Sequence, residues 1–221
     1  VTSFLETQNK EIWVGSWGKG VVTYDSAFLR TRPVVYNGVP ANDPNYKLVW
    51  TTLQHSQTKK ILIGCQTARI IVHDPVTKAN RFITPPVLEN KTVRQLAEDK
   101  DGNVWIGSQY GHLIRWDLSP NKAGTEEEFT LIHNLNTIIY KLFIDEDGFI
   151  WACTHAYGVY KIHPQTGRIV SKYHTKAVTG KALYSDVATD IIQYDDSLFV
   201  IATGALDVLN SRITKFNHLM T

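Results

Sequence analysis

The sequence predicts an all-β fold, organised as a β-propeller of four-stranded antiparallel blades. Two observations carry this prediction. The residues are rich in β-branched and aromatic types, and no segment has the apolar spacing of a long helix. A similar phrase also recurs along the chain, as "KEIWVGSWGKGVVTYD", "KKILIGCQTARIIVHD", "GNVWIGSQYGHLIRWD" and "GFIWACTHAYGVYKIH".

The spacing of the repeat sets the size of each unit. Trp13, Leu62, Trp105 and Trp151 align in the four copies, and a weaker fifth copy, "SLFVIATGALDVL", places Val200 at the same position. The intervals of 49, 43, 46 and 49 residues match the size of a propeller blade. We therefore expect one domain whose blades span about residues 1–45, 46–90, 91–135, 136–185 and 186–221.

About five blades are compatible with two arrangements. The chain forms either a small five-bladed ring or an open segment of a seven-bladed propeller. An open segment would expose apolar blade edges, so it is expected to associate with itself, for example as a dimer.

Each unit divides into four strands separated by turns. In the fourth copy these strands are "TIIYKLFIDEDG", "FIWACTH", "GVYKIHPQTG" and "RIVSKYH". Gly102, Gly148 and Gly167 are expected in tight turns that require a positive φ. Because both faces of a blade pack against neighbours, "IWVG", "VWIG" and "IWAC" are apolar at successive positions.

The third strand of each unit ends at a characteristic position. His73 and His163 align there with Asp25 and Asp117 of the other copies, which suggests a turn cap. Two longer connections are expected to be surface loops, at residues 36–46 and 123–129.

The composition narrows the classes of function. The 221 residues are 43% hydrophobic and 20% charged, as in a soluble globular protein. The net charge of +2 argues for neither nucleic acid nor an anionic membrane as a partner, and no window has the apolar length of a membrane helix. Cys65 and Cys153 lie two blades apart, so we expect two free, buried thiols, with no metal site and no cofactor.

The candidate binding residues lie where the loops of a propeller reach its axial mouth. Ligands of propellers usually bind there, between the loops that join second to third strands and the segments that lead into first strands. The residues there combine aromatic faces, which can stack on a sugar ring, with amide, cationic and imidazole donors, which can bond its hydroxyls. The candidates are Trp17, Lys19, Arg69, Tyr110, His112, His155, Tyr157 and Asp186.

Two copies carry a family resemblance. "AEDKDGNVWIGSQYGHLIRWD" and "FIDEDGFIWACTHAYGVYKIHPQTGRI" resemble the two-component regulator propeller repeat, with its acidic DxxG turn, its apolar-Trp-apolar-Gly strand and its PxTG turn. In that family, tandem seven-bladed propellers form the extracytoplasmic, periplasmic sensor region of bacterial hybrid histidine kinases in the inner membrane. The resemblance implies a noncatalytic sensor segment that binds a small carbohydrate-like ligand, such as an oligosaccharide. The histidine kinase and the membrane attachment would lie outside this chain.

Two other functions stay open. The chain could be a propeller scaffold for protein–protein interaction without a small ligand. It could also be a metal-dependent lyase of the streptogramin lyase type, which would use His112 and His155, although neither histidine has the HxH or HxxxH spacing of a metal site.

Overall fold

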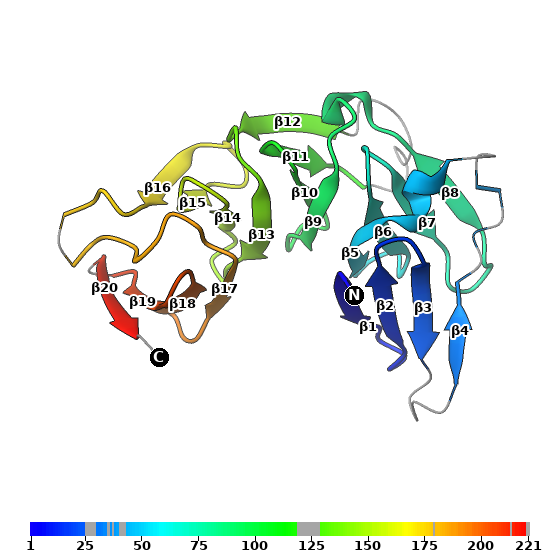
Figure 1. The fold of residues 1–221 in the computed structure, drawn as a ribbon, viewed down its shortest axis with the longest axis horizontal. Helices are drawn as coiled ribbons and strands as arrows, with labels where there is room; N and C mark the ends of the chain where they lie inside the picture. Colours follow the sequence, from blue (N-terminus) through cyan, green and yellow to red (C-terminus); the bar gives the residue numbers. More distant parts are fainter. Residues whose placement is uncertain are drawn as a thin grey trace. The chain divides into compact units, whose positions relative to one another are not determined.

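The structure is a computed structural model that describes residues 1–24, 30–34, 36, 38–39, 43–118, 129–178, 180–212 and 214–219. Over these ranges the chain forms five four-stranded antiparallel sheets (Figure 1). The helices found there are two short 3₁₀ turns, η1 (Pro44–Lys47) and η2 (Pro86–Leu88), and neither is long enough to cross a membrane. The predicted all-β architecture of four-stranded blades is confirmed.

Each sheet takes its four strands from consecutive parts of the chain. The first sheet contains β1 (Ser3–Glu6), β2 (Ile12–Ser16), β3 (Gly20–Tyr24) and β4 (Thr31–Pro33). The second contains β5 (Val49–Gln54), β6 (Ile61–Cys65), β7 (Ile70–His73) and β8 (Asn80–Ile83). The third contains β9 (Val93–Glu98), β10 (Val104–Ser108), β11 (His112–Trp116) and β12 (Phe129–Asn134). The fourth contains β13 (Ile139–Ile144), β14 (Ile150–Thr154), β15 (Val159–Ile162) and β16 (Ile169–Tyr173), and the fifth contains β17 (Asp190–Gln193), β18 (Leu198–Ala202), β19 (Leu206–Asn210) and β20 (Lys215–Leu219).

The chain divides into two compact units. The first unit consists of residues 1–108 and 114–131, and the second of residues 109–113 and 132–221. The first two sheets lie wholly in the first unit and the last two wholly in the second.

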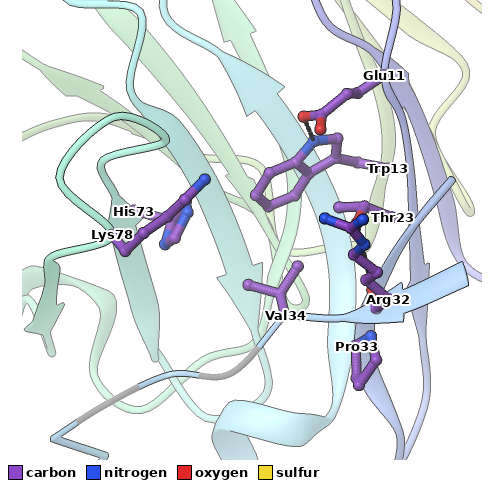
Figure 2. A pocket seen from close by; sticks show the side chains of 8 residues that line it. All are labelled: Glu11, Trp13, Thr23, Arg32, Pro33, Val34, His73 and Lys78. Atoms are coloured by element: carbon purple, nitrogen blue, oxygen red, sulfur yellow. Dashed lines mark hydrogen bonds between the residues drawn. The ribbon is translucent and has the colours of Figure 1, made fainter. Parts of the chain in front are cut away.

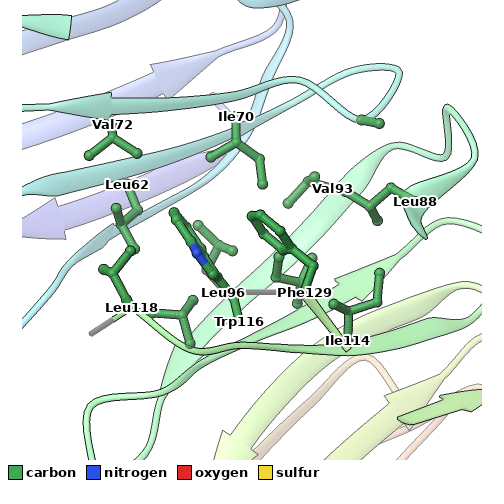
Figure 3. Close-up of a cluster of buried hydrophobic side chains, with 13 residues drawn as sticks. Leu62, Ile70, Val72, Leu88, Val93, Leu96, Ile114, Trp116, Leu118 and Phe129 are labelled. Carbon is green, nitrogen blue, oxygen red and sulfur yellow. The ribbon is translucent and has the colours of Figure 1, made fainter. Parts of the chain in front are cut away.

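The first unit has two hydrophobic cores, one on each face of the second sheet. Strands alternate their side chains between faces, so Ile61, Ile63 and Cys65 of β6 pack with Trp13 of the first sheet. Leu62 points the other way and joins a second cluster (Figure 3). That cluster is completed by Ala68, Ile70, Val72, Leu88, Val93, Leu96, Val104, Ile106, Ile114, Trp116, Leu118 and Phe129.

The core of the second unit is built on stacked aromatic rings. Trp151 of β14 lies 4.5 Å from Phe199 and 5.6 Å from Tyr173, measured between ring centroids, and both pairs are stacked. Phe199 is 2% exposed, whereas Val200 is only half-buried. Phe199 therefore occupies the position of the repeated tryptophan, and the predicted assignment of Val200 to that position was wrong by one residue.

The central strands of the sheets differ in how many faces are covered. Every residue of β6, β10 and β14 is buried, as the successive apolar residues of "VWIG" and "IWAC" predicted. In β2, by contrast, buried and half-buried residues alternate, and β18 has the same pattern. The prediction that "IWVG" is covered on both faces was therefore wrong for the first sheet.

The tight turns are confirmed where glycine was expected. Gly102, Gly148 and Gly167 have φ values of 85°, 87° and 68°. The acidic residue of the DxxG turn has a further role, because Asp99 and Asp145 each accept a hydrogen bond at 2.8 Å from the indole nitrogen of the tryptophan six residues later.

The turn after the third strand departs from the expected register. In the second sheet Asp74, not His73, makes the closing backbone bonds, with Asp74 N donating to Ala79 O. His163 makes the matching bond to Arg168 O in the fourth sheet. His163 therefore corresponds to Asp74, and the alignment of His163 with His73 was wrong by one residue.

Some predictions fall partly outside the described residues. Asp25 and most of the loop at 123–129 lie outside them, and the loop at 36–46 is described only in part. Both cysteines are free and buried, as predicted, and burial raises the pKa of the Cys65 and Cys153 thiols.

Candidate functional site

The loops that carry most candidate residues are held by backbone hydrogen bonds. Each loop between a second and a third strand bonds to the segment that leads into the next sheet, so neighbouring sheets are linked beside the candidate side chains. These links order the loops without using any candidate side chain. The bonded pairs are Gly18 with Lys47 and Ala68 with Lys91 in the first unit, and Gly111 with Leu135 and Gly158 with Asp186 in the second, at 2.8 to 3.0 Å.

In the first unit, Trp17 and Lys19 are exposed, whereas Arg69 is held in an ion pair. Trp17 is 65% exposed. The Arg69 Nε lies 2.6 Å from Oδ2 of Asp43, and Arg69 Nη1 donates to Thr67 O. Burial raises the pKa of Asp43, but hydrogen bonds from Arg69 and Asn45 outweigh it, so this pKa lies below its ordinary value. Arg69 thus ties its loop to η1, while Trp17 and Lys19 face solvent.

In the second unit, the two tyrosines are exposed and one histidine is not. Tyr110 and Tyr157 are 62% and 44% exposed, and the Nζ of Lys172 lies 5.3 Å from the Tyr157 ring. His112 is only 2% exposed and lies inside β11. A ligand at the surface would therefore meet the tyrosine rings before it met His112.

The remaining candidates of the second unit bond to neighbouring residues. His155 Nδ1 lies 2.8 Å from the Tyr140 hydroxyl, and the two rings meet edge to face. Asp186 accepts hydrogen bonds from the backbone nitrogen and the hydroxyl of Thr175, at 2.7 and 2.9 Å. Asp186 therefore orders the segment before the fifth sheet through both of its carboxylate oxygens.

Three residues missed by sequence reasoning lie at a repeated β-bulge. The ladder between first and second strands skips one residue near the start of β5, β9 and β13, and the skipped residues are Trp50, Arg94 and Tyr140. A bulge turns its extra side chain out of the regular alternation and is common beside binding sites. The available signal was a large side chain directly after a buried Val or Ile in "VWTTLQ", "VRQLAE" and "IYKLFI".

Two of these bulge residues join Trp17 in one cluster of the first unit. The Trp17 and Trp50 rings lie 6.5 Å apart and are tilted by 45°. The guanidinium carbon of Arg94 lies 3.8 Å from the centroid of Trp50, and Trp50 Nε1 donates to Gln66 Oε1 at 2.8 Å. We call Trp17, Trp50, Gln66 and Arg94 the indole platform.

The indole platform combines the groups that recognise a polar ring. It has an exposed indole face on Trp17, and a second indole held in place by an amide and a guanidinium. Indole faces bind the C–H surface of a sugar, while amide and guanidinium groups bond hydroxyls. The platform therefore has the chemistry expected of the binding site, with partners for Trp17 other than those predicted.

A cavity lies elsewhere in the first unit, between the first and second sheets. Its volume is about 360 Å³ (Figure 2). Glu11, which lines it, precedes β2, whereas Trp17 follows β2, so the cavity and the indole platform lie at opposite ends of that strand. The lining residues are Glu11, Trp13, Thr23, Arg32, Pro33, Val34, His73 and Lys78.

The described part of the chain contains no group of three or more His, Cys, Asp or Glu residues placed to hold a metal ion. The two histidines considered for lyase chemistry differ in setting. His112 is buried, whereas His155 is exposed and bonded to Tyr140.

Comparison with known families gives one match, which begins before the third sheet and covers its first two strands. The model of the two component regulator propeller matches residues 87–110. This segment contains the Asp99 turn and the Trp105 strand, on which the sequence resemblance depends. The resemblance is therefore confirmed, with the match of the family model limited to this segment.

Solved structures share the fold at low sequence identity. The extracellular domain of a putative one component system from B. thetaiotaomicron aligns with a TM-score of 0.71 and 20% identity, over 91% of this chain and 26% of that one. The extracellular domain of a putative hybrid two component system from the same organism aligns with a TM-score of 0.65 and 19% identity, over 99% of this chain and 34% of that one. A chain of the mitotic checkpoint complex aligns with a TM-score of 0.72 and 10% identity, over 98% of this chain and 62% of that one.

At these identities the structural matches show the propeller-like fold alone. This chain spans about a quarter to a third of the length of the two B. thetaiotaomicron chains. No curated protein has a sequence that matches it.

Proposed function

We propose that this chain, which carries a two-component regulator propeller repeat at residues 87–110, is a noncatalytic sensor segment of a hybrid two-component regulator. It lies in the extracytoplasmic, periplasmic part of the parent protein and passes ligand binding to a histidine kinase outside this chain. The family match and the extracellular domains among its structural neighbours support this role.

The proposed ligand is carbohydrate-like, and the indole platform is its binding site. The exposed face of Trp17 supports this assignment best, because it lies beside a second indole whose polar partners are already fixed. Lys19 is exposed in the same loop and adds a donor for hydroxyl groups. Burying an indole face against a sugar ring would remove apolar surface from water without removing a charge.

The position of the indole platform also offers a route for the signal. Trp17 comes from the loop after β2, Trp50 from the start of β5 and Arg94 from the start of β9. A ligand that contacts all three would bind best when the first three sheets hold one arrangement. Binding would then shift the population towards that arrangement, as signalling requires.

The test is a calorimetric titration of the chain with each member of a panel of neutral oligosaccharides. We expect saturable binding of at least one sugar. Trp17→Ala should weaken it roughly tenfold, since stacking on one aromatic face contributes on the order of 1 kcal/mol. Tyr194→Ala is the matched control, because this exposed ring lies in the turn between β17 and β18, and the variant should bind like the wild type.

A protein-interaction scaffold is the second candidate function. It is favoured by the exposed apolar side chain of Phe4 on the first sheet. If no sugar in the panel binds, or if Trp17→Ala binds sugar like the wild type, the carbohydrate proposal is wrong and the interaction scaffold becomes the better-supported function.

A further inference from the structure

The cavity between the first two sheets has walls of different character. On one side are Thr23 of β3 and Arg32 of β4, and on the other is the β7–β8 hairpin with His73 and Lys78 (Figure 2). Its volume of about 360 Å³ lies at the lower end of the range for small-molecule sites. Both walls belong to the first unit, so the cavity is contained within one compact body.

The inner end of the cavity is aromatic and fixed in position. The rings of Trp13 and His73 lie 5.4 Å apart, and both residues are buried. His73 Nδ1 lies 2.8 Å from Oδ1 of Asn80, which orients the imidazole. Pro33 and Val34 extend the apolar lining. A ligand body in this space would meet rings and aliphatic groups.

The rim carries more positive than negative charge. Arg32 and Lys78 are exposed and extend into the gap from opposite sides (Figure 2). Lys78 Nζ donates to Pro75 O at 2.6 Å, and within the described ranges no carboxylate lies within ion-pair distance of either cation. Among the described residues of the lining, Glu11 is the one carboxylate, and its Oε2 lies 3.4 Å from Trp13 Nε1.

We propose that this cavity is a second ligand site, which binds a small monocarboxylate with a compact apolar or ring-shaped body. Among the described lining residues, two cations stand against one carboxylate and leave one positive charge to be balanced, so a monoanion fits better than a neutral molecule or a dianion. The fork of the Arg32 guanidinium matches a carboxylate in two parallel hydrogen bonds. The aromatic and aliphatic lining then accepts the rest of the molecule.

The site is tested on the full chain with benzoate, and with benzamide as its neutral analogue of the same shape. Ligand-observed NMR should show saturable binding of benzoate that weakens as salt is added, and much weaker binding of benzamide. Arg32→Gln and Lys78→Gln should each weaken benzoate binding roughly fivefold, since each removes one partly exposed charge contact.

The second sheet offers a matched control for Lys78. Lys59 has the same backbone conformation, with a φ of 59° against 61° for Lys78, and its Nζ also bonds to the carbonyl oxygen three residues earlier. Lys59→Gln should leave benzoate binding unchanged. Trp17→Ala should also leave it unchanged, because this site does not depend on the indole platform.

Three results would overturn the proposal. Benzoate and benzamide could bind equally, which would exclude recognition of the charge. Arg32→Gln and Lys78→Gln could both bind benzoate like the wild type. Lys59→Gln could weaken binding as much as Lys78→Gln, which would leave only a nonspecific effect of surface charge.

Discussion

Gly158 occupies a loop position that a side chain cannot share. Its φ is 75°, and a Cβ added there would lie 1.9 Å from the backbone oxygen of Tyr173. Neither atom could move without breaking the fourth sheet, where Val159 pairs with Tyr173. We therefore expect Gly158→Ala to destabilise the chain by about 3 kcal/mol or more.

Gly180 serves as the control, because it has a positive φ like Gly158 but lacks the steric clash. Its φ is 79°, but apart from its chain neighbours no atom of the described residues lies within 4 Å of an added Cβ. Gly180→Ala should therefore cost only about 1 kcal/mol, the cost of the backbone conformation alone. Urea unfolding, monitored by tryptophan fluorescence, would give the free energy of unfolding of both variants. Equal losses of this free energy would refute the clash at Gly158.

Exposed loop residues were predictable from the sequence, whereas their bonding partners were not. The exposed rings of Trp17, Tyr110 and Tyr157 follow from their place in the loops after second strands. The pairing of Arg69 with Asp43 does not, because the two are 26 positions apart and a different repeat supplies each. A contact between repeats depends on how sheets are rotated against each other, which the repeat pattern does not encode.

The turn that joins β13 to β14 shows how one carboxylate supports an element. Asp145 accepts hydrogen bonds from Phe149 N and Trp151 Nε1, and its Oδ2 lies 3.0 Å from Lys161 Nζ. Asp145→Ala would leave the buried indole nitrogen and the half-buried ammonium without their acceptor. We expect a loss of about 2–4 kcal/mol in the free energy of unfolding.

Asp147→Ala is the control for this prediction, since it lies in the same turn and is exposed. It should change the free energy of unfolding by less than about 0.5 kcal/mol. Chemical denaturation of both variants gives the comparison. Similar losses in the two would mean that the acidic turn acts through its net charge and not through the bonds of Asp145.

The elements themselves were predictable, but their registers were less so. Four strands per repeat follow from the apolar runs and the glycine turns, and the structure has them. Val200 was assigned in place of Phe199, and His73 in place of Asp74, because the copies were matched by letters, while packing depends on which face a side chain takes. The bulges at Trp50, Arg94 and Tyr140 were missed for the same reason, since a bulge changes the face without changing the composition.

In the part of the chain that the structure describes, the first and last sheets each carry a row of apolar side chains on one face that its own unit leaves partly exposed. In the first sheet, Phe4 pairs with Val14, and Val14 pairs with Val22, so all three share one face. Phe4 is 71% exposed. The fifth sheet has a similar row, in which Ile192, Val200 and Val208 pair across three strands.

Such faces favour self-association, which the sequence predicted for an open set of blades. When a second copy covers an apolar sheet face, apolar surface is removed from water and the free energy of the system falls. Sedimentation velocity at rising concentration should therefore show dimers or larger species. The double variant Phe4→Lys with Ile192→Lys should sediment as a monomer over the same range, because each lysine places a charge on the apolar face of its sheet, at the exposed residue of the row.

Val76→Lys serves as the control, because Val76 is also highly exposed but lies in a turn and belongs to no such row. It should associate like the wild type. If the wild type is monomeric at every concentration, or if the double variant associates as strongly as the wild type, these faces do not drive association. A loss of association in the double variant alone would show that the two end sheets, and not scattered surface residues, set the oligomeric state.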